Sequence, residues 1–303
     1  MSEIITVGLD LAKNVFQAHG ADALGRALFR KKLRRDQVLP FFSQQPSCVV
    51  AMEACGGAHF WGRELGKLGH EVRLIPPAYV KPFVKRQKND MADAEAICEA
   101  ATRPTMRFVP VKSEETQGAA MVFRIRELLI RQRTQAINAL RGHLGEFGQI
   151  VPQGAGNAAR LMAIIEDPDS GLPADAIATL DVLVAALRHL EAEIGKLDAE
   201  ISRRAKDNEV ARRLMTIPGI GPLIATAIAT LAPPPELFRK GRDFAAWLGL
   251  TPRQHSTGGK QRLGATTKMG ERSLRRLMII GANSVVIKRH VHASARAGTW
   301  LGG

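Results

Sequence analysis

Aromatic residues are scarce in this chain, where they make up 5% of 303 residues and include a single tyrosine. Proteins that bind single-stranded nucleic acid mainly by base stacking depend on aromatic platforms, so we do not expect stacking to be the main mode of binding. Long apolar runs are missing too, and no stretch approaches the roughly 20 residues that a membrane-spanning helix needs. We therefore expect no membrane partner.

Cysteine is also rare, with residues only at Cys48, Cys55 and Cys98. Their positions show no paired spacing typical of a zinc site, so we expect three reduced core residues in a cytosolic protein. The N-terminus lacks the basic and apolar regions of a secretory signal, and secretion is not expected. We predict a cytoplasmic location.

Acidic residues are few relative to basic ones: 29 Asp and Glu stand against 43 Lys and Arg, which gives a net charge of +14. Such an excess indicates a polyanionic partner, and a phosphate-contacting surface fits the low aromatic content. Hydrophobic residues make up 45% of the chain, which is typical of a globular protein.

Short apolar, β-branched runs alternate with helical patterns in the first third of the chain. Strands are expected at 4–9, 14–18, 26–33, 48–52 and 71–75, and helices at 38–42 and 60–68. This alternation predicts an α/β domain whose sheet is covered on both faces. Asp10 and Glu53 stand at the ends of two of the strands, where a buried carboxylate is costly unless it is paired with a cation or with donors.

Two further acids, Asp90 and Asp93, open a helix expected at 90–101, directly after a basic segment at 81–88. Acids at a helix start also serve simply to complement the helix dipole, and an Asp at a strand end often only caps a turn. If all four carboxylates meet, they can hold two Mg²⁺ ions about 4 Å apart, the arrangement used for phosphodiester displacement.

Long helical patterns occupy the middle of the chain. A helix is expected from Ser113 onward, with an apolar face and many arginines. Leucines and isoleucines alternate by three and four from Leu180 to Ile201, which indicates a coiled-coil seam of about three heptads. Two interpretations stay open: a contact between protomers, or an antiparallel helix pair within one chain.

The last third carries two glycine-containing motifs. Residues 217–222 (IPGIGP) resemble a helix-hairpin-helix turn, in which Gly219 and Gly221 would bring backbone N–H groups near a phosphate. Ser256 lies in a glycine-containing basic loop, either as a phosphate ligand or as a nucleophile. The full set of residues predicted to contact nucleic acid is Lys85, Arg86, Lys88, Arg124, Arg131, Gly219, Gly221, Arg253, Lys260, Arg262, Lys268 and Arg272.

Taken in order, these motifs resemble one family over nearly the whole chain. Residues 8–13 (GLDLAK), 52–57 (MEACGG) and 88–94 (KNDMADA) are similar to the RuvC-like domain of the DEDD transposases of bacterial insertion sequences. Residues 217–221, 249–252 and 268–270 are similar to the C-terminal transposase domain of the same family.

The resemblance implies a fold and a set of roles. It implies an RNase H-like α/β domain at 1–112, a helical coiled-coil insertion at 113–208 and a mainly helical domain at 209–303. Asp10, Glu53, Asp90 and Asp93 would form an Mg²⁺-binding acidic tetrad. Ser256 would be a nucleophile that links covalently to DNA, with Thr257 as the alternative if the register slips by one.

The same resemblance implies partners: DNA at element ends and targets, a structured guide RNA encoded by the element (a bridge RNA), and a homodimer or tetramer formed through the coiled coil in a bacterial, nucleoid-associated setting. In this assembly the serine of one protomer would work beside the tetrad of another. Related chains usually continue beyond the equivalent of Trp300, so a shortened copy is expected. Two other functions stay open: a junction-resolving nuclease that uses the tetrad alone, and a non-catalytic nucleic-acid-binding remnant.

Overall fold

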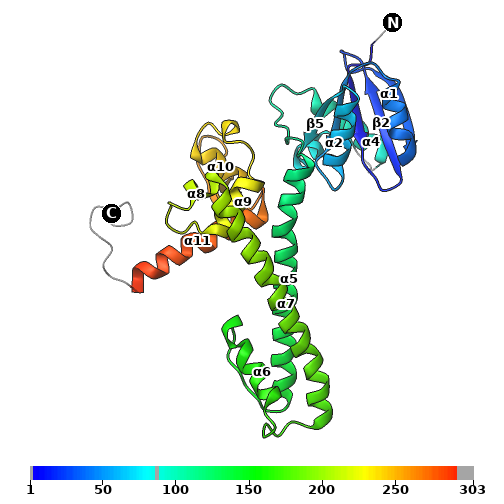
Figure 1. Cartoon of the computed structure of the whole chain (residues 1–303). Coiled ribbons are helices and arrows are strands. Elements are labelled where there is room, and N and C mark those ends of the chain that lie inside the picture. The colour runs from blue at the N-terminus through cyan, green and yellow to red at the C-terminus, as the bar shows by residue number, and fades with distance from the viewer. Residues whose placement is uncertain (1–2, 86–88, 292–303) are drawn as a thin grey trace. The chain divides into compact units, whose positions relative to one another are not determined.

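The computed structural model describes residues 3–85 and 89–291 (Figure 1). The chain divides into two compact units, residues 1–117 and 118–303. The first is an α/β unit built on one sheet, and the second consists mainly of helices with a small β-hairpin. A mixed α/β fold with a central sheet is compatible with the RNase H-like architecture that the resemblance implies, whereas the three-part division of the chain stays a prediction.

The sheet of the N-terminal unit has five strands in the order β3-β2-β1-β4-β5. Their bounds are β1 Thr6–Asp10, β2 Val15–Ala21, β3 Ala27–Arg34, β4 Val49–Glu53 and β5 Glu71–Ile75. The first three strands form antiparallel pairs, and β1, β4 and β5 run parallel. The predicted strands lie within a few residues of these bounds, and β5 matches its predicted range in full.

Helices cover both faces of this sheet, as the alternating pattern predicts. On one face, α1 (Val38–Ser43) and α2 (Ala58–Lys67) bury Phe42, Trp61 and Leu65 against apolar residues of the strands. On the other face, α4 (Asp90–Ala101) packs Ile97 and several alanines against Ala51 and Ile75, near the short helix α3 (Pro77–Val80). Successive residues of each strand therefore contribute to opposite cores, because side chains alternate across a strand.

The two edge strands of the sheet, β3 and β5, differ in what lies beside them. At one edge, β3 carries exposed basic residues, among them Arg30, Lys31 and Lys32. At the other edge, the backbone N–H of Val109 donates to the carbonyl of Leu74 in β5 at 2.7 Å. A short piece of extended chain thus pairs with β5 on its outer side.

The C-terminal unit is built around an antiparallel helix pair. Helix α5 (Glu114–Glu146) begins in the N-terminal unit and continues into this one, where it packs along α7 (Ala174–Asp207). At one end, α5, α7 and α6 (Ala158–Glu166) share a core. At the other end, α5 and α7 pack on the following helices. Between the two helices, the guanidinium of Arg126 in α5 donates two hydrogen bonds to the carboxylate of Asp198 in α7.

The predicted heptad face of α7 lies mainly within this intramolecular core. Leu180, Leu187, Ile194 and Ile201 are all buried in the single chain. Burial of that face against α5 and α6 is what the antiparallel-pair interpretation predicts. A coiled coil between protomers stays a prediction.

The remaining elements follow α7 closely. They are α8 (Glu209–Leu214), α9 (Pro222–Leu231), α10 (Gly241–Trp247), strands β6 (Pro252–Gln254) and β7 (Leu263–Thr266), and α11 (Arg272–Val291). Between α8 and α9, Gly219 adopts a φ of +84°, and a Cβ there would lie 2.7 Å from the carbonyl oxygen of Gly281 in α11. Glycine at 219 is therefore required for close packing of the turn on α11.

Two further sequence expectations can be compared with the structure. Cys48 and Cys98 are buried as expected, but Cys55 is exposed, so its assignment to the core was wrong. Cys55 lies in the turn after β4, where the chain leaves the sheet, and its apolar neighbours in sequence gave a misleading signal. Within the described ranges, no helix is long and apolar enough to cross a membrane.

Candidate active site

The position of Asp10 is set by its place on β1. Gly8 and Asp10 share one face of the strand because they are two residues apart, and α4 crosses this face. A Cβ on Gly8 would lie 2.1 Å from the carbonyl oxygen of Ala94 and 2.6 Å from the amide nitrogen of Cys98. Only glycine lets the α4 backbone approach this closely, which brings the first turn of α4 to the end of β1.

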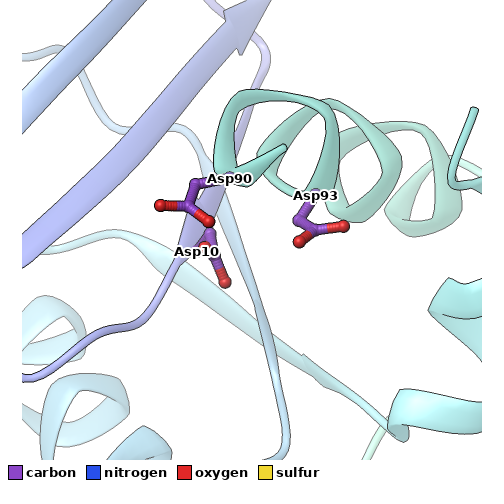
Figure 2. A group of neighbouring side chains, drawn as sticks. All are labelled: Asp10, Asp90 and Asp93. Atoms are coloured by element: carbon purple, nitrogen blue, oxygen red, sulfur yellow. The ribbon is translucent and has the colours of Figure 1, made fainter. Parts of the chain in front are cut away.

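The first turn of α4 supplies two carboxylates to the same place. Asn89 caps the helix by accepting a hydrogen bond from the Met91 amide at 2.9 Å, and Asp90 and Asp93 follow directly. Asp10, Asp90 and Asp93 each offer an oxygen atom, and these atoms lie within 4.8 Å of one another. Figure 2 shows the three carboxylates gathered at the start of α4.

Glu53 lies at the end of β4, the strand parallel to β1. The register pairs Gly8 with Ala51, so continuing it by two residues sets Glu53 beside Asp10 on the face that α4 covers. Glu53 is not in the group of oxygens within 4.8 Å, but its charge contributes to the raised pKa of Asp10. The four predicted acids therefore lie at the carboxyl ends of β1 and β4, three of them with oxygens within 4.8 Å of one another and Glu53 beside them.

The carboxylates repel one another, and this repulsion has a measurable consequence. Burial, followed by the charges of Asp93, Asp90 and Glu53, raises the pKa of Asp10 from 3.8 to about 6. A cation placed among the oxygens would relieve both effects. Opposite oxygens around an octahedral Mg²⁺ are about 4.2 Å apart, so the 4.8 Å cluster fits a divalent ion after a small adjustment.

A cluster of ion pairs flanks this site. Glu95, two residues after Asp93, accepts from Lys85 and from Arg30 of β3, the latter at 3.1 Å. The ammonium of Lys85 pairs with Glu95 and its side chain remains mostly exposed, so the predicted contact of Lys85 with nucleic acid stays a prediction. Arg86 and Lys88, predicted for the same role, lie outside the described residues.

Ser256 lies in the C-terminal unit, in a hairpin that the sequence interpretation treated as a loop. Thr257 and Lys260 exchange two backbone hydrogen bonds across Gly258 and Gly259, both of which have positive φ. This is the pattern of a two-residue type I′ hairpin turn. Ser256 directly precedes the turn, and its Oγ accepts a hydrogen bond from the Arg262 amide at 3.1 Å.

Basic side chains surround this hairpin. The predicted phosphate contacts Arg253, Lys260, Arg262, Lys268 and Arg272 are all exposed, and no ion pair involves them among the described residues. Arg124 and Arg131 on α5 are exposed as well. Gly221 directly precedes α9, and a Cβ built on it would meet no atom within 4 Å, while its predicted contact with phosphate stays a prediction.

Sequence reasoning missed two features of these sites. The pairing of Lys85 and Arg30 with Glu95 joins residues far apart in the chain, and no local pattern signals it. The sequence does contain a pattern that predicts the hairpin, because Gly258-Gly259 between two short polar runs is typical of a two-residue turn.

Two models of transposase families match parts of this chain. Residues 7–148 match the model of the DEDD transposases of the IS110 group, described as "Transposase", and residues 211–297 match the model described as "Transposase IS116/IS110/IS902 family". A probable family 20 transposase of Pseudomonas aeruginosa is 51% identical over 92% of this chain and 83% of its own length.

Two further relatives are transposases of named insertion sequences. That of element IS1328 from Yersinia enterocolitica is 40% identical over 100% of this chain and 90% of its own length. That of element IS1111A from Coxiella burnetii is 38% identical over 99% of this chain and 83% of its own length. The DEDD family typically uses divalent metal ions, in agreement with the carboxylate cluster. The chain belongs to the IS110/IS116 family of insertion-sequence transposases, enzymes that cut and rejoin DNA.

Proposed function

We propose that this transposase cuts and rejoins DNA with two separate groups: the Mg²⁺-binding acids Asp10, Glu53, Asp90 and Asp93, and the nucleophile Ser256. The observation that carries the proposal is the cluster of three aspartates within 4.8 Å, in which the pKa of Asp10 is raised to about 6. A structural role for these acids gives no reason to gather like charges at the end of a strand.

The four acids have a defined task in this proposal. They hold the cation, and Asp10 must be ionised to do so, which the cation itself favours. The chemistry that Mg²⁺ supplies at such a site is polarisation of the phosphate and neutralisation of the charge that develops during displacement.

Ser256 forms the covalent bond. Its hydroxyl loses a proton to a base, Oγ bonds to the phosphorus, and the bond from phosphorus to the departing sugar oxygen breaks as that oxygen takes up a proton. The Arg262 amide donates to Oγ and would stabilise negative charge on it. Lys260 and Arg262 would hold the phosphate. Thr257 has its backbone fixed by the turn and remains the alternative nucleophile.

The acids and Ser256 belong to different units of the chain. We propose that they meet when the serine of one protomer joins the tetrad of another in a homodimer or tetramer. A structured guide RNA would pair with the DNA, and the charge of +14 supports binding of both nucleic acids.

Covalent trapping tests the proposal. Wild-type protein, substrate DNA, guide RNA and Mg²⁺ should give a protease-sensitive protein–DNA adduct. Ser256→Ala and Asp10→Asn should each lose the adduct, while Ser256→Ala still binds DNA. An adduct that survives Ser256→Ala and disappears in Thr257→Ala would move the nucleophile by one residue. Cleavage without any adduct in both variants would refute the serine chemistry and favour a resolving nuclease that uses the acids alone.

A further inference from the structure

A hollow of about 540 Å³ lies in the N-terminal unit, and none of the roles above uses it. Its lining includes Asn14, Arg34, Arg35, Phe60 and Trp61. These residues come from the β1–β2 loop, the end of β3 with the turn after it, and the first half of α2. The hollow therefore combines aromatic, cationic and amide groups from three segments, together with the carboxylate of Asp36.

Its aromatic wall is supported from behind. Phe60 packs edge to face on Trp61 with the ring centroids 5.2 Å apart, and Trp61 packs in the same manner on the buried Phe16 at 5.1 Å. Trp61 is 4% exposed, whereas Phe60 keeps 41% of its surface exposed. In a chain with so few aromatics, Phe60 offers a ring to solvent on a rigid base.

The polar groups of the hollow differ in how firmly they are held. The Arg35 guanidinium lies 5.1 Å from the Trp61 ring centroid and donates to the Lys13 carbonyl at 3.3 Å, so its position is fixed. The Arg34 side chain is 71% exposed, with a 3.6 Å ion pair to Asp36. The exposed side-chain amide of Asn14 has no hydrogen-bond partner within the described part of the chain.

One residue that lines the hollow, Asn14, lies near the carboxylate Asp10 in the sequence. Asn14 follows Asp10 by four residues, so their Cα atoms are at most roughly 14 Å apart. A nucleic-acid strand rises about 3.4 Å per nucleotide in a duplex, so this distance corresponds to about four nucleotides. The hollow and the acids therefore lie at the same end of the sheet, the hollow on the face that α2 covers and the acids on the face that α4 covers.

We propose that this hollow binds one unpaired nucleotide of the DNA strand that the carboxylates act on. The base would stack on Phe60, the amide of Asn14 would bond to the base edge, and Arg34 and Arg35 would contact the adjoining phosphate. A planar base with a phosphate attached matches the aromatic, amide and cationic groups, with the phosphate taking the place of Asp36 as the partner of Arg34. An acidic peptide would use the arginines alone. The inference rests on the proposed DNA-cutting function.

A fluorescence experiment tests it. DNA duplexes with a short single-stranded flap that carries 2-aminopurine are titrated with the protein in chelator, which prevents cleavage. Wild-type protein should quench the probe through stacking. Phe60→Ala should abolish the quenching and weaken flap binding by roughly 5- to 150-fold, the usual loss for one stacked base. Phe60→Trp should retain both the quenching of 2-aminopurine and the affinity for the flap.

Controls separate stacking from folding. Tyr79→Ala removes a ring of similar exposure, 46%, from the same unit, and it should change flap binding by less than about 2-fold. Phe60→Leu keeps an apolar side chain and should still lose the quenching, so a folding defect in Phe60→Ala does not decide the result. A fully paired duplex should bind equally well to wild type and Phe60→Leu.

The outcomes distinguish the two proposals. If wild type binds and cuts DNA but Phe60→Leu quenches and binds the flap as wild type does, the nucleotide site is refuted and the proposed function stands. If Phe60→Leu weakens RNA binding and leaves flap binding intact, the assignment to DNA is refuted. If wild type neither binds nor cuts DNA with Mg²⁺ present, both proposals fail.

Discussion

Replacing Asp10 with asparagine should stabilise the metal-free N-terminal unit. The folded protein holds the pKa of Asp10 at about 6, above its usual 3.8, so the folded state favours the protonated carboxyl. The stabilising contribution of that proton is complete below pH 4 and is lost as the pH rises through 6. The free energy of unfolding of wild type should therefore fall as the pH is raised from about 4 to above 6, whereas that of Asp10→Asn should not.

The size of the effect follows from the shift. About two pKa units correspond to about 3 kcal/mol, and partial exposure of Asp10 reduces this to roughly 1–1.5 kcal/mol. Divalent ion should reverse the order of stability at pH 7.5, because wild type gains about 2.7 kcal/mol when Mg²⁺ stands at about 100 times its Kd. Asp10→Asn, with one ligand charge removed, should gain less.

Urea unfolding of the N-terminal unit measures both effects. Trp61 is its only tryptophan, so a Trp247→Phe/Trp300→Phe background makes fluorescence report on this unit alone. Asp36→Asn is the matched control, because it removes an exposed carboxylate of the same unit away from the cluster. Equal pH profiles for wild type and Asp10→Asn in chelator, or equal stabilisation by Mg²⁺, would refute the electrostatic reasoning.

Two further predictions concern the α4 contact and the basic hairpin. Gly8→Ala should force α4 away from β1, cost about 1–3 kcal/mol and weaken Mg²⁺ binding measured by calorimetry, because its Cβ meets backbone atoms of α4; Gly66→Ala, with open space around it, should do neither. Lys260→Gln/Arg262→Gln should lower the slope of log K for DNA against log salt by about 1.8, whereas Lys196→Gln, whose ammonium pairs with Glu193, should leave it unchanged. An unaltered slope in the double variant would show that the hairpin does not contact phosphates.

Much of the N-terminal fold could be predicted because its central strands β1 and β4 are short apolar runs that each end in an acidic residue. The acids could be located for the same reason, since Asp10 and Glu53 follow such runs directly. Their closeness depends on Gly8 meeting Ala94, a contact between residues 86 positions apart that no local pattern records. The hairpin around Ser256 was missed because β6 and β7 span only three and four residues, too few to show alternation.

The two edge strands of the sheet affect the tendency of newly synthesised chains to aggregate. An unpaired strand edge is a template for another chain, and intermolecular strand pairing is a common route to aggregation. Here β5 is capped by the extended chain at Val109, so its outer hydrogen bonds are partly used. The outer edge strand, β3, instead presents the exposed Lys31 and Lys32, and two such edges would repel each other. Part of the positive charge that suits a DNA-binding enzyme thus also protects its sheet from self-association.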